Sequence, residues 1–346
     1  MNVNFLKITF RSLLALLLGL ALTACNRSHP IEKFGGDAQG TTYHISYWLP
    51  EHSDSLALKQ EVNAEFQRLD KILSNYRPDS DIEQLNKTVS TEPQVVNNEI
   101  IFLIETARQV SIASDGCYDL SIKPLFDLWG FKDDKLTIPE QPTIDATLKE
   151  VGFANIEVLD STHLKKHVPD LRIDLSSIAQ GYSVAKIAHL LETKGIENYL
   201  VEIGGELQTK GSKPDGESWR VALEKPLPEQ RTMHKIISIA QKEPLTVMTS
   251  GTYRHFFDAN GQRYSHILDA RTGKPIQHHT VSVTVLHNNP TEADAWSTAL
   301  LCLGKEAGLA AAERAGIAAL FIEQQGETFN EFSSPALKAL KSITIQ

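Results

Sequence analysis

The chain has 346 residues, of which 34 are Lys or Arg and 43 are Asp or Glu, so its formal net charge is −9. This length exceeds the roughly 250–300 residues at which one hydrophobic core stops growing, so two lobes or domains are expected. An acidic chain without a basic block lacks the positive surface that nucleic-acid binding requires, and no nucleic-acid partner is expected. Three cysteines are too few for a disulfide framework.

The first residues have the pattern of an export signal. Lys7 and Arg11 precede an apolar stretch at 13–22 that is too short to span a bilayer comfortably. This stretch leads into the sequence LTAC at 22–25, which resembles a bacterial lipobox, in which the cysteine is lipidated and becomes the mature N-terminus. Lipidation at Cys25 is therefore expected. The alternative is an ordinary signal peptide or anchor with a chance cysteine.

These features divide the chain into a signal peptide at 1–24, a lipid-anchored tether at 25–33 and a folded domain at 34–346. Removal of the leader takes two basic residues away and lowers the net charge from −9 to −11. We expect a protein of the bacterial periplasm, attached by its lipid to the inner or the outer membrane.

The predicted secondary structure alternates between helices and strands. Apolar residues at helical spacing indicate helices at 56–73, 98–114, 177–194, 291–303 and 305–315. Short β-branched or alternating runs indicate strands at 156–159, 171–175, 199–203, 219–224, 244–251, 281–287 and 317–323. The segment 171–203 is thus predicted to be a strand–helix–strand unit, and the fold class is mixed α/β or α+β.

Common enzyme motifs such as HExxH, the P-loop, GxSxG and GxGxxG are missing from the sequence. Polar junctions between elements are the candidates instead. A strand ending at Asp174 and a helix beginning near Ser176 or Ser177 would present free backbone N–H groups, which are able to hold a phosphate. The alternative is that these side chains only cap the helix.

A second junction lies at the start of the predicted helix 291–303. Asp294 and Thr298 are four residues apart, so their oxygens share one helix face, with Ser297 beside them. A carboxylate and a hydroxyl suit Mg²⁺, which commonly leaves its other positions to water and substrate phosphate. A capped helix with a polar face is the alternative.

Two further turns complete the candidates. We expect His266, Asp269 and Arg271 to lie close together, with the imidazole as a general base, although a lone histidine is more often an ordinary residue. The turn with Tyr118 and Asp119 precedes Trp129 and Phe131, and it could line a pocket for a planar ring or simply pack in the core.

Cys117 and Cys302 show neither zinc nor redox spacing and are expected to be structural thiols.

Seven sequence blocks in this order resemble the ApbE family, the FAD:protein FMN transferases. They are GTTY at 40–43, LSNYRPDSDI at 73–82, the Tyr118-Asp119 turn, IDLSSIAQGY at 173–182, VEIGGE at 201–206, the His266 segment and the helix with Asp294 and Thr298. The resemblance covers the chain from about Phe34 to the C-terminus. It implies an α+β fold of two lobes, with sheets flanked by helices and the active site in the cleft between the lobes.

The resemblance also implies a reaction. Members of the family bind FAD and Mg²⁺, cleave the pyrophosphate and transfer FMN through a phosphoester bond to a Thr or Ser hydroxyl of an acceptor protein, releasing AMP. Carried over by motif, the Mg²⁺ ligands are Asp294, Thr298 and the carbonyl of Ser177, with Ser297 nearby. His266 is the candidate base for the acceptor hydroxyl.

FAD contacts are implied for a group of residues in these blocks, namely Gln39, Tyr76, Tyr118, Asp119, Leu120, Asp174, Gln180 and Leu268. This chain departs from the family at Gln39, where a Met is usual, and at Ala270, where a Pro is common. Gln offers hydrogen bonds where Met offers a soft apolar surface, so the contact at this position is in doubt.

The implied partner is an acceptor protein with a flavinylation motif, similar to Asp-Gly-x-(Ser/Thr)-Gly-Ala-Thr, such as a periplasm-facing subunit of a redox complex. Two alternatives remain. A Mg²⁺-dependent FAD pyrophosphatase would use water in place of the acceptor, and a flavin-binding lipoprotein would hold FAD without chemistry.

Overall fold

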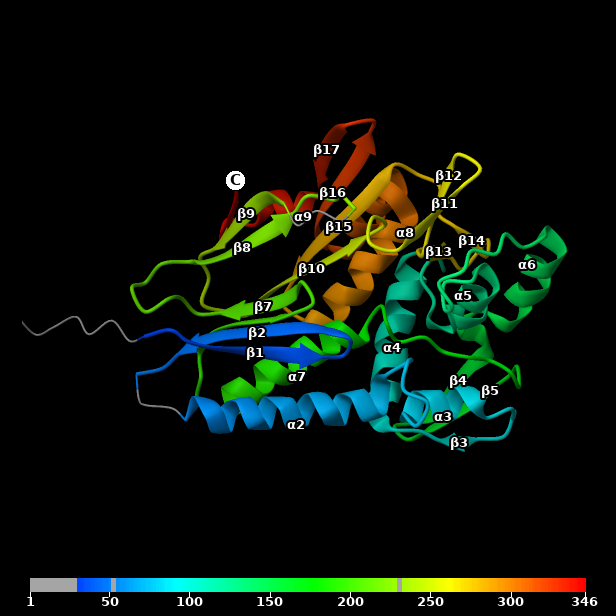
Figure 1. Ribbon diagram of the computed structural model, residues 1–346, viewed down its shortest axis with the longest axis horizontal. Helices are drawn as coiled ribbons and strands as arrows, with labels where there is room; N and C mark the ends of the chain where they lie inside the picture. Colours follow the sequence, from blue (N-terminus) through cyan, green and yellow to red (C-terminus); the bar gives the residue numbers. More distant parts are fainter. Residues whose placement is uncertain (1–29, 51–53, 229–231) are drawn as a thin grey trace, which may run out of the picture. The chain divides into compact units, whose positions relative to one another are not determined.

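An eight-stranded sheet runs through the centre of the fold (Figure 1). The computed structural model describes residues 30–50, 54–228 and 232–346, so the predicted signal peptide and Cys25 lie outside the described residues. All neighbouring strands of the sheet are antiparallel. In spatial order they are β1 (Glu32–Ala38), β2 (Thr41–Trp48), β6 (Asn198–Ile203), β7 (Glu206–Lys210), β10 (Leu245–Gly251), β15 (Thr280–His287), β16 (Ala318–Gln325) and β17 (Thr328–Ser333).

Smaller sheets surround the central one. Three strands form a sheet in the order β18 (Ile343–Ile345), β9 (Met233–Ile239) and β8 (Trp219–Glu224). Another three-stranded sheet has the order β3 (Gln94–Val95), β5 (His163–Lys166) and β4 (Ile156–Asp160). Two hairpins pair β11 (Phe256–Ala259) with β12 (Gln262–Ser265) and β13 (Leu268–Asp269) with β14 (Lys274–Pro275).

The helices between these strands include long and short members. They are α2 (Ser55–Leu73), α3 (Asp81–Lys87), α4 (Asn98–Ala113), α5 (Lys123–Trp129), α6 (Gln141–Thr147), α7 (Ala179–Thr193), α8 (Pro290–Ala315) and α9 (Pro335–Ala339). Single 3₁₀ turns occur at Leu120–Ile122, Leu148–Glu150 and Phe153–Asn155. The part of the chain that the structure describes has no helix long and apolar enough to cross a membrane.

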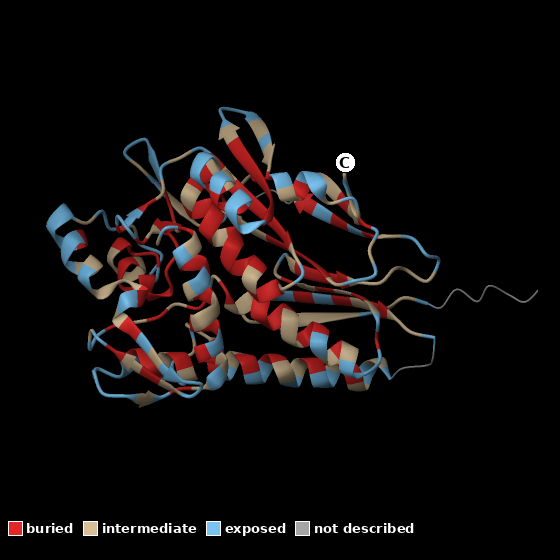
Figure 2. Ribbon diagram, turned by 180° about the vertical axis from the view of Figure 1, so that it is seen from behind, coloured by how far each residue is buried: buried red, intermediate tan, exposed pale blue. Residues whose placement is uncertain are grey.

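The two sides of the central sheet pack against different hydrophobic cores, because successive side chains of a strand point to opposite sides of the sheet. On β10, Met248 joins the core that contains α2, α4, α7 and α8, whereas Val247 joins the core beneath β8 and β9. On β16, Phe321 and Leu320 divide in the same way. Figure 2 shows buried residues along the strands and α8, with exposed residues on outer elements such as α6.

Local sequence explains the helix limits. Asp54 caps α2 by accepting hydrogen bonds from Leu56 N and Ala57 N at 3.1 and 3.0 Å. In α8, Gly304 has φ 72°, which breaks the regular helix. The prediction of two helices at 291–303 and 305–315, separated at this residue, is confirmed.

One predicted strand is wrong. The segment 171–175 is not a strand, because side chains and isolated backbone carbonyls, rather than a neighbouring strand, satisfy its backbone. Ile173 N donates to Asn86 Oδ1 at 2.7 Å, and Leu175 N donates to Asn75 Oδ1 at 2.7 Å. The predicted strand–helix–strand unit is therefore an irregular segment followed by α7 and β6.

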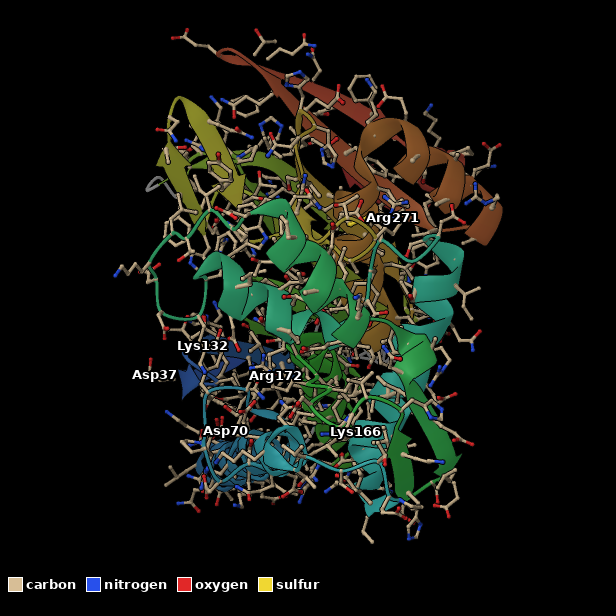
Figure 3. All side chains as sticks on the ribbon, turned by 90° about the vertical axis from the view of Figure 1, so that its right-hand side faces the viewer. Asp37, Asp70, Lys132, Lys166, Arg172 and Arg271 are labelled. Atoms are coloured by element: carbon tan, nitrogen blue, oxygen red, sulfur yellow. A yellow bond between two sulfur atoms is a disulfide. The ribbon has the colours of Figure 1, made fainter. Side chains whose placement is uncertain are left out.

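Two cationic side chains make polar contacts near this segment. Arg172 pairs with Asp127 of α5. Lys166 is fully buried, and its ammonium donates to the carbonyls of Leu85 and Thr88 at 2.7 and 2.9 Å, at the end of α3. Figure 3 labels both Arg172 and Lys166. The residues from Ile31 onward form one compact unit that begins just before β1. Its division into two lobes stays a prediction.

Candidate active site

A cavity of about 440 Å³ lies among the loops of the central sheet, α7 and α8. This volume falls in the range of small-molecule sites. Most of the predicted site residues line it, namely Tyr76, Tyr118, Asp119, Asp174, Ser177, Gln180, His266, Leu268, Asp294 and Thr298. The motifs that the sequence places far apart thus meet in one place.

Three predicted residues are not among those that line the cavity. Gln39 lies in the β1–β2 turn, where its amide donates to Ser183 Oγ at 2.8 Å. Leu120 is fully buried, and its carbonyl accepts from Asp174 N at 2.7 Å. Ser297 is also fully buried, and its hydroxyl donates to the carbonyl of Asp294 at 2.8 Å. Leu120 and Ser297 thus support residues that line the cavity, whereas Gln39 lines a separate surface hollow at the β1–β2 turn.

The start of α7 and the first turns of α8 meet through Gly181 and Asp294. Gly181 lies in the first turn of α7, where a regular helix leaves the backbone N–H without an intrahelical partner, and this N–H donates to Asp294 Oδ2 at 2.7 Å. A Cβ at Gly181 would clash with the Pro290 carbonyl oxygen and with Asp294 Cβ. Ser177 precedes α7 and lines the same cavity as Asp294.

Thr298 lies one helical turn after Asp294 and lines the same cavity. Its hydroxyl is 2.9 Å from Ser250 Oγ, which is also 2.7 Å from Ser297 Oγ. Ser250 on β10 thus orients both hydroxyls of α8. Ser250 lies within the strand predicted at 244–251, where periodicity gives no signal for a functional role.

Glu206 is a candidate that sequence reasoning missed. Its carboxylate lines the cavity and accepts from Thr249 N at 3.0 Å. Burial and the Asp294 carboxylate raise the pKa of Glu206 well above its usual value. Burial likewise raises the pKa of Asp294 to about 7, although the N–H of Gly181 opposes this. The available signal was the Gly204-Gly205-Glu206 turn that follows a predicted strand.

The charge of the cavity is strongly uneven. Among the described residues that line it, Arg254 is the one Lys or Arg, and Glu224 holds its guanidinium at 2.8 Å. The carboxylates are those of Asp119, Asp174, Glu206, Glu224 and Asp294. Oxygen donors with a surplus of negative charge fit a hard divalent cation such as Mg²⁺. The residues present therefore fit the predicted metal.

His266 is held in one tautomer. Its Nδ1 lies 2.9 Å from the backbone carbonyl oxygen of His255, which can only accept, so Nδ1 carries the proton and Nε2 keeps its lone pair. Burial lowers the pKa of His266 to about 4, and the nearby His255 ring acts in the same direction. A neutral imidazole with a free Nε2 is suited to accept a proton.

The expected cluster of His266, Asp269 and Arg271 does not form around this imidazole. Asp269 and Arg271 pair with each other at 2.7 Å and line a separate surface hollow. The reason is local, because the Asp269 carboxylate also accepts from Arg271 N at 2.9 Å and closes a tight turn. The stacked ring beside His266 is that of His255, with ring centroids 5.5 Å apart.

Tyr118 and Asp119 line the cavity from the turn after α4. Ser177 Oγ donates to the Tyr118 hydroxyl at 3.2 Å, and burial raises the pKa of Tyr118, so its ring stays neutral. The Asp119 carboxylate accepts from Ser121 N and Phe153 N at 2.8 and 2.9 Å. Asp119 thus fixes the turn as well as lining the cavity.

Cys117 and Cys302 correct another prediction. They form a disulfide across 185 residues, with Cα atoms 6.0 Å apart, and both line the cavity. Their sulfurs and an Asp269 oxygen lie within 4.8 Å of one another, but the bonded sulfurs are not available as thiolate ligands. Two cysteines without a spacing motif give no sequence signal for pairing.

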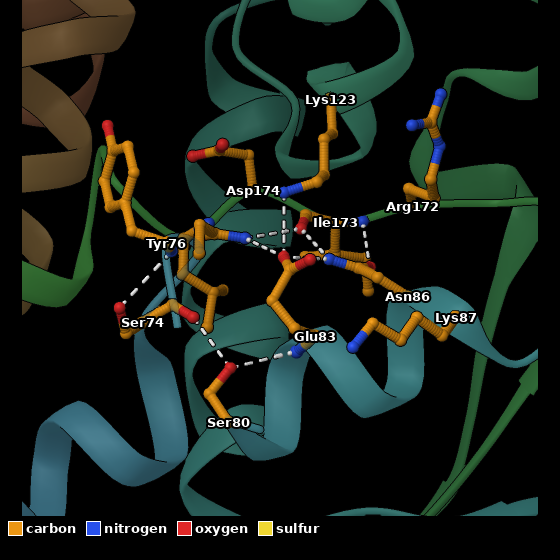
Figure 4. Close-up of polar contacts among 12 residues, drawn as sticks. Ser74, Tyr76, Ser80, Glu83, Asn86, Lys87, Lys123, Arg172, Ile173 and Asp174 are labelled. Atoms are coloured by element: carbon orange, nitrogen blue, oxygen red, sulfur yellow. Dashed lines mark hydrogen bonds and ion pairs between the residues drawn. The ribbon is translucent and has the colours of Figure 1, made fainter. Parts of the chain in front are cut away.

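A polar network positions Asp174 and the loop of Tyr76 (Figure 4). Glu83 Oε1 accepts from Lys123 Nζ at 2.7 Å and from Asn86 Nδ2 at 3.0 Å. Asn86 Nδ2 also donates to the carbonyl of Ile173 at 2.8 Å. Burial alone would raise the pKa of Glu83, but the hydrogen bonds from Lys123 and Asn86 outweigh it and lower the pKa. A partly buried ion pair therefore supports the segment that carries Asp174.

Replacement of Lys123 by Met is expected to cost about 1.5–3 kcal/mol of unfolding free energy, because it removes a charge-assisted hydrogen bond from the partly buried Glu83 carboxylate. The double variant Lys123→Met/Glu83→Gln should recover most of this loss. Lys87→Met is the matched control, because it removes an exposed lysine from α3, the helix that carries Glu83. Urea denaturation measures the unfolding free energy of all three variants. Equal values for Lys123→Met and Lys87→Met would contradict a stabilising role of the Lys123–Glu83 ion pair.

A cavity that joins carboxylate, hydroxyl and carbonyl oxygens to a neutral imidazole is typical of enzymes that act on phosphate-containing ligands. The sequence profile of the ApbE family matches residues 39–321. The chain is 36% identical to the FAD:protein FMN transferase of Vibrio cholerae over 333 residues, covering 95% of this chain and 98% of the relative. The chain belongs to the ApbE family, as the resemblance predicted.

Solved structures agree with this assignment. The flavin transferase ApbE from Vibrio cholerae matches with a TM-score of 0.80 and covers 89% of this chain and 99% of its own. The apo form of the Pseudomonas stutzeri flavinyl transferase ApbE matches with a TM-score of 0.82 at 39% identity, over 90% of this chain and 97% of its own. The predicted α+β fold is confirmed.

Proposed function

We propose that the protein is a FAD:protein FMN transferase, which moves FMN from FAD to a Thr or Ser hydroxyl of an acceptor protein and releases AMP. The near full-length similarity to relatives with this name supports the proposal. The observation that carries it is the position of the neutral His266 in the same cavity as Asp294 and Thr298. A base and a set of oxygen ligands are the two components that such a transfer needs.

The chemistry is a phosphoryl transfer. The acceptor hydroxyl oxygen attacks the phosphorus on the FMN side of the pyrophosphate, and the bond from this phosphorus to the bridging oxygen breaks. AMP leaves with the bridging oxygen, and the hydroxyl proton passes to His266 Nε2. Because this reaction needs little covalent catalysis, the positioning of the reactants accounts for much of the rate acceleration.

Mg²⁺ is the proposed cation, and Asp294 Oδ, the Thr298 hydroxyl and the carbonyl of Ser177 are its proposed ligands. When bound, it would offset the negative charge of the pyrophosphate and of the departing phosphate. The cavity walls contribute the guanidinium of Arg254 as their own positive charge. The carboxylate of Glu206 interacts electrostatically with that of Asp294. Its oxygens are ligands of the type that Mg²⁺ prefers.

We also propose that Cys25 is lipidated and anchors the enzyme to a bacterial membrane, with the catalytic unit in the periplasm. The LTAC sequence after an apolar core supports the anchor. The Cys117–Cys302 disulfide supports an oxidising compartment. The proposed acceptor is therefore a protein with a flavinylation motif that faces the same compartment, such as a subunit of a redox complex.

The test combines purified protein, FAD, Mg²⁺ and an acceptor that carries a flavinylation motif. We expect a fluorescent acceptor band that survives denaturing electrophoresis, together with one AMP for each flavin attached. Free FMN and AMP with every acceptor would instead identify a pyrophosphatase. FAD binding without any AMP would identify a flavin-storing protein.

A further inference from the structure

The Cys117–Cys302 disulfide lies where three segments of the cavity meet. Cys117 directly precedes Tyr118 in the turn after α4. Cys302 follows Thr298 by four residues and Asp294 by eight, so all three side chains share one face of α8. The carbonyl of Cys117 accepts from Ala270 N at 3.2 Å, which connects the same turn to the segment after His266.

The Tyr118 hydroxyl contacts Ser177 Oγ and the Asp119 carboxylate accepts from Phe153 N, so these contacts connect the turn to segments other than α8. The remaining polar contacts of the turn are local or weak. Cys117 N donates to the Ser114 carbonyl at 3.2 Å, and Gly116 N donates to the Ser111 carbonyl at 2.9 Å, both within the end of α4. Asp115 reaches Arg314 at 3.7 Å, but both side chains are exposed to solvent. Exposed ion pairs of this kind contribute little. The disulfide, with both cysteines buried, is the covalent tie between the turn and α8.

We propose that this disulfide is a positioning element of the active site, in addition to any contribution that it makes to stability. It holds the Tyr118 turn against the oxygens of α8, so that the wall that contacts FAD and the wall that holds the cation keep one mutual position. The inference rests on the proposed function, because it assigns FAD and the cation to these two walls.

A consequence follows for binding. Without the cross-link, the turn and α8 adopt the binding geometry only part of the time, and the apparent dissociation constant rises by the inverse of that fraction. If the binding geometry is populated about one tenth of the time, FAD binds about tenfold more weakly. Because the cation is held on α8 and the flavin nucleotide contacts the turn, the loss is expected to be largest when both ligands are present.

The experiment uses the double variant Cys117→Ala/Cys302→Ala in the full chain. FAD affinity is measured by flavin fluorescence with and without Mg²⁺, and KM and kcat are measured for transfer to the acceptor. We expect about tenfold weaker FAD binding in Mg²⁺, a smaller enhancement of FAD binding by Mg²⁺, and a higher KM with kcat within about threefold of the parent.

Leu191→Ala is the matched control. Leu191 is fully buried in the core near the end of α7, about 18 Å along that helix from its first residue Ala179. Its truncation destabilises the fold through a cavity but leaves the walls of the site in place. Both variants are compared at a temperature where each is folded, and Leu191→Ala should keep the FAD affinity of the parent.

Parental FAD affinity and parental Mg²⁺ enhancement in the double variant would overturn the inference, even if its melting temperature fell. If the double variant does not fold, the parent is reduced by a phosphine under native conditions, and the same binding is measured after the two thiols have been counted. The outcomes are separable from those of the proposed function, because a parent that does not bind FAD contradicts that function, whereas an unchanged variant contradicts only the positioning role.

Discussion

His266→Ala is expected to lower the rate of FMN transfer by about 10²–10⁴-fold, the range that a general base contributes, while FAD binding stays within a few-fold of the parent. The reason is geometric. The backbone carbonyl of His255 holds the ring with Nε2 unprotonated, and Nε2 is the atom that we propose as recipient of the acceptor proton. Single-turnover transfer at saturating FAD measures the effect.

His279→Asn is the control for this variant, since His279 is exposed and does not line the cavity. A transfer rate for His266→Ala equal to that of His279→Asn would remove the assigned role. NMR titration of the ring gives a second readout. Because burial lowers the pKa of His266 to about 4, the neutral basic form persists as the pH falls, and the His266 imidazole should titrate below pH 6.5. Protonation of the His266 ring at or above pH 6.5 would contradict the buried neutral ring.

Asp294→Asn is expected to abolish the Mg²⁺ dependence of transfer and to lower kcat/KM by about 10³-fold, since metal stabilisation of the transition state is worth several kcal/mol. The amide keeps the size of the side chain and an oxygen that accepts from Gly181 N. Removal of one of two neighbouring buried charges also relieves the repulsion between Asp294 and Glu206, so the melting temperature without metal should not fall. Thermal melting therefore separates loss of the ligand from loss of the fold.

Glu292→Gln provides the comparison on the same helix, because Glu292 accepts from Asn289 near the helix cap, away from the cavity. Activity is titrated with Mg²⁺ for both variants, and calorimetry measures cation binding directly. Full Mg²⁺-dependent activity in Asp294→Asn would contradict the metal assignment.

Local patterns were sufficient for the elements with strong periodicity. The buried residues of α2, such as Val62 and Phe66, have the spacing that predicted the helix, and Gly304 marked the break in α8. The prediction that Asp294, Thr298 and His266 share one site came from the resemblance of ordered sequence blocks to the ApbE family, and all three residues line one cavity.

The misplaced features depend on contacts between distant parts of the chain. Segment 171–175 has a strand-like composition, but Asn75 and Asn86 occupy its hydrogen-bonding groups from about a hundred residues away. The burial of Glu206 depends on how β7 packs beside β10, and the Cys117–Cys302 bond depends on α4 ending next to α8. A single sequence does not reveal which distant segments contact one another.

The junction between α7 and α8 also determines how substitutions would act on the proposed cation site. The proposed ligand from residue 177 is a main-chain oxygen, so a change of the side chain would remove the hydrogen bond to Tyr118 but not that ligand. Residue 181 contributes a main-chain N–H and the absence of a Cβ, so any other amino acid would push the Asp294 helix away. Mutational tolerance in the centre of the proposed site is therefore set by backbone position, and it is lower at Gly181 than at Ser177.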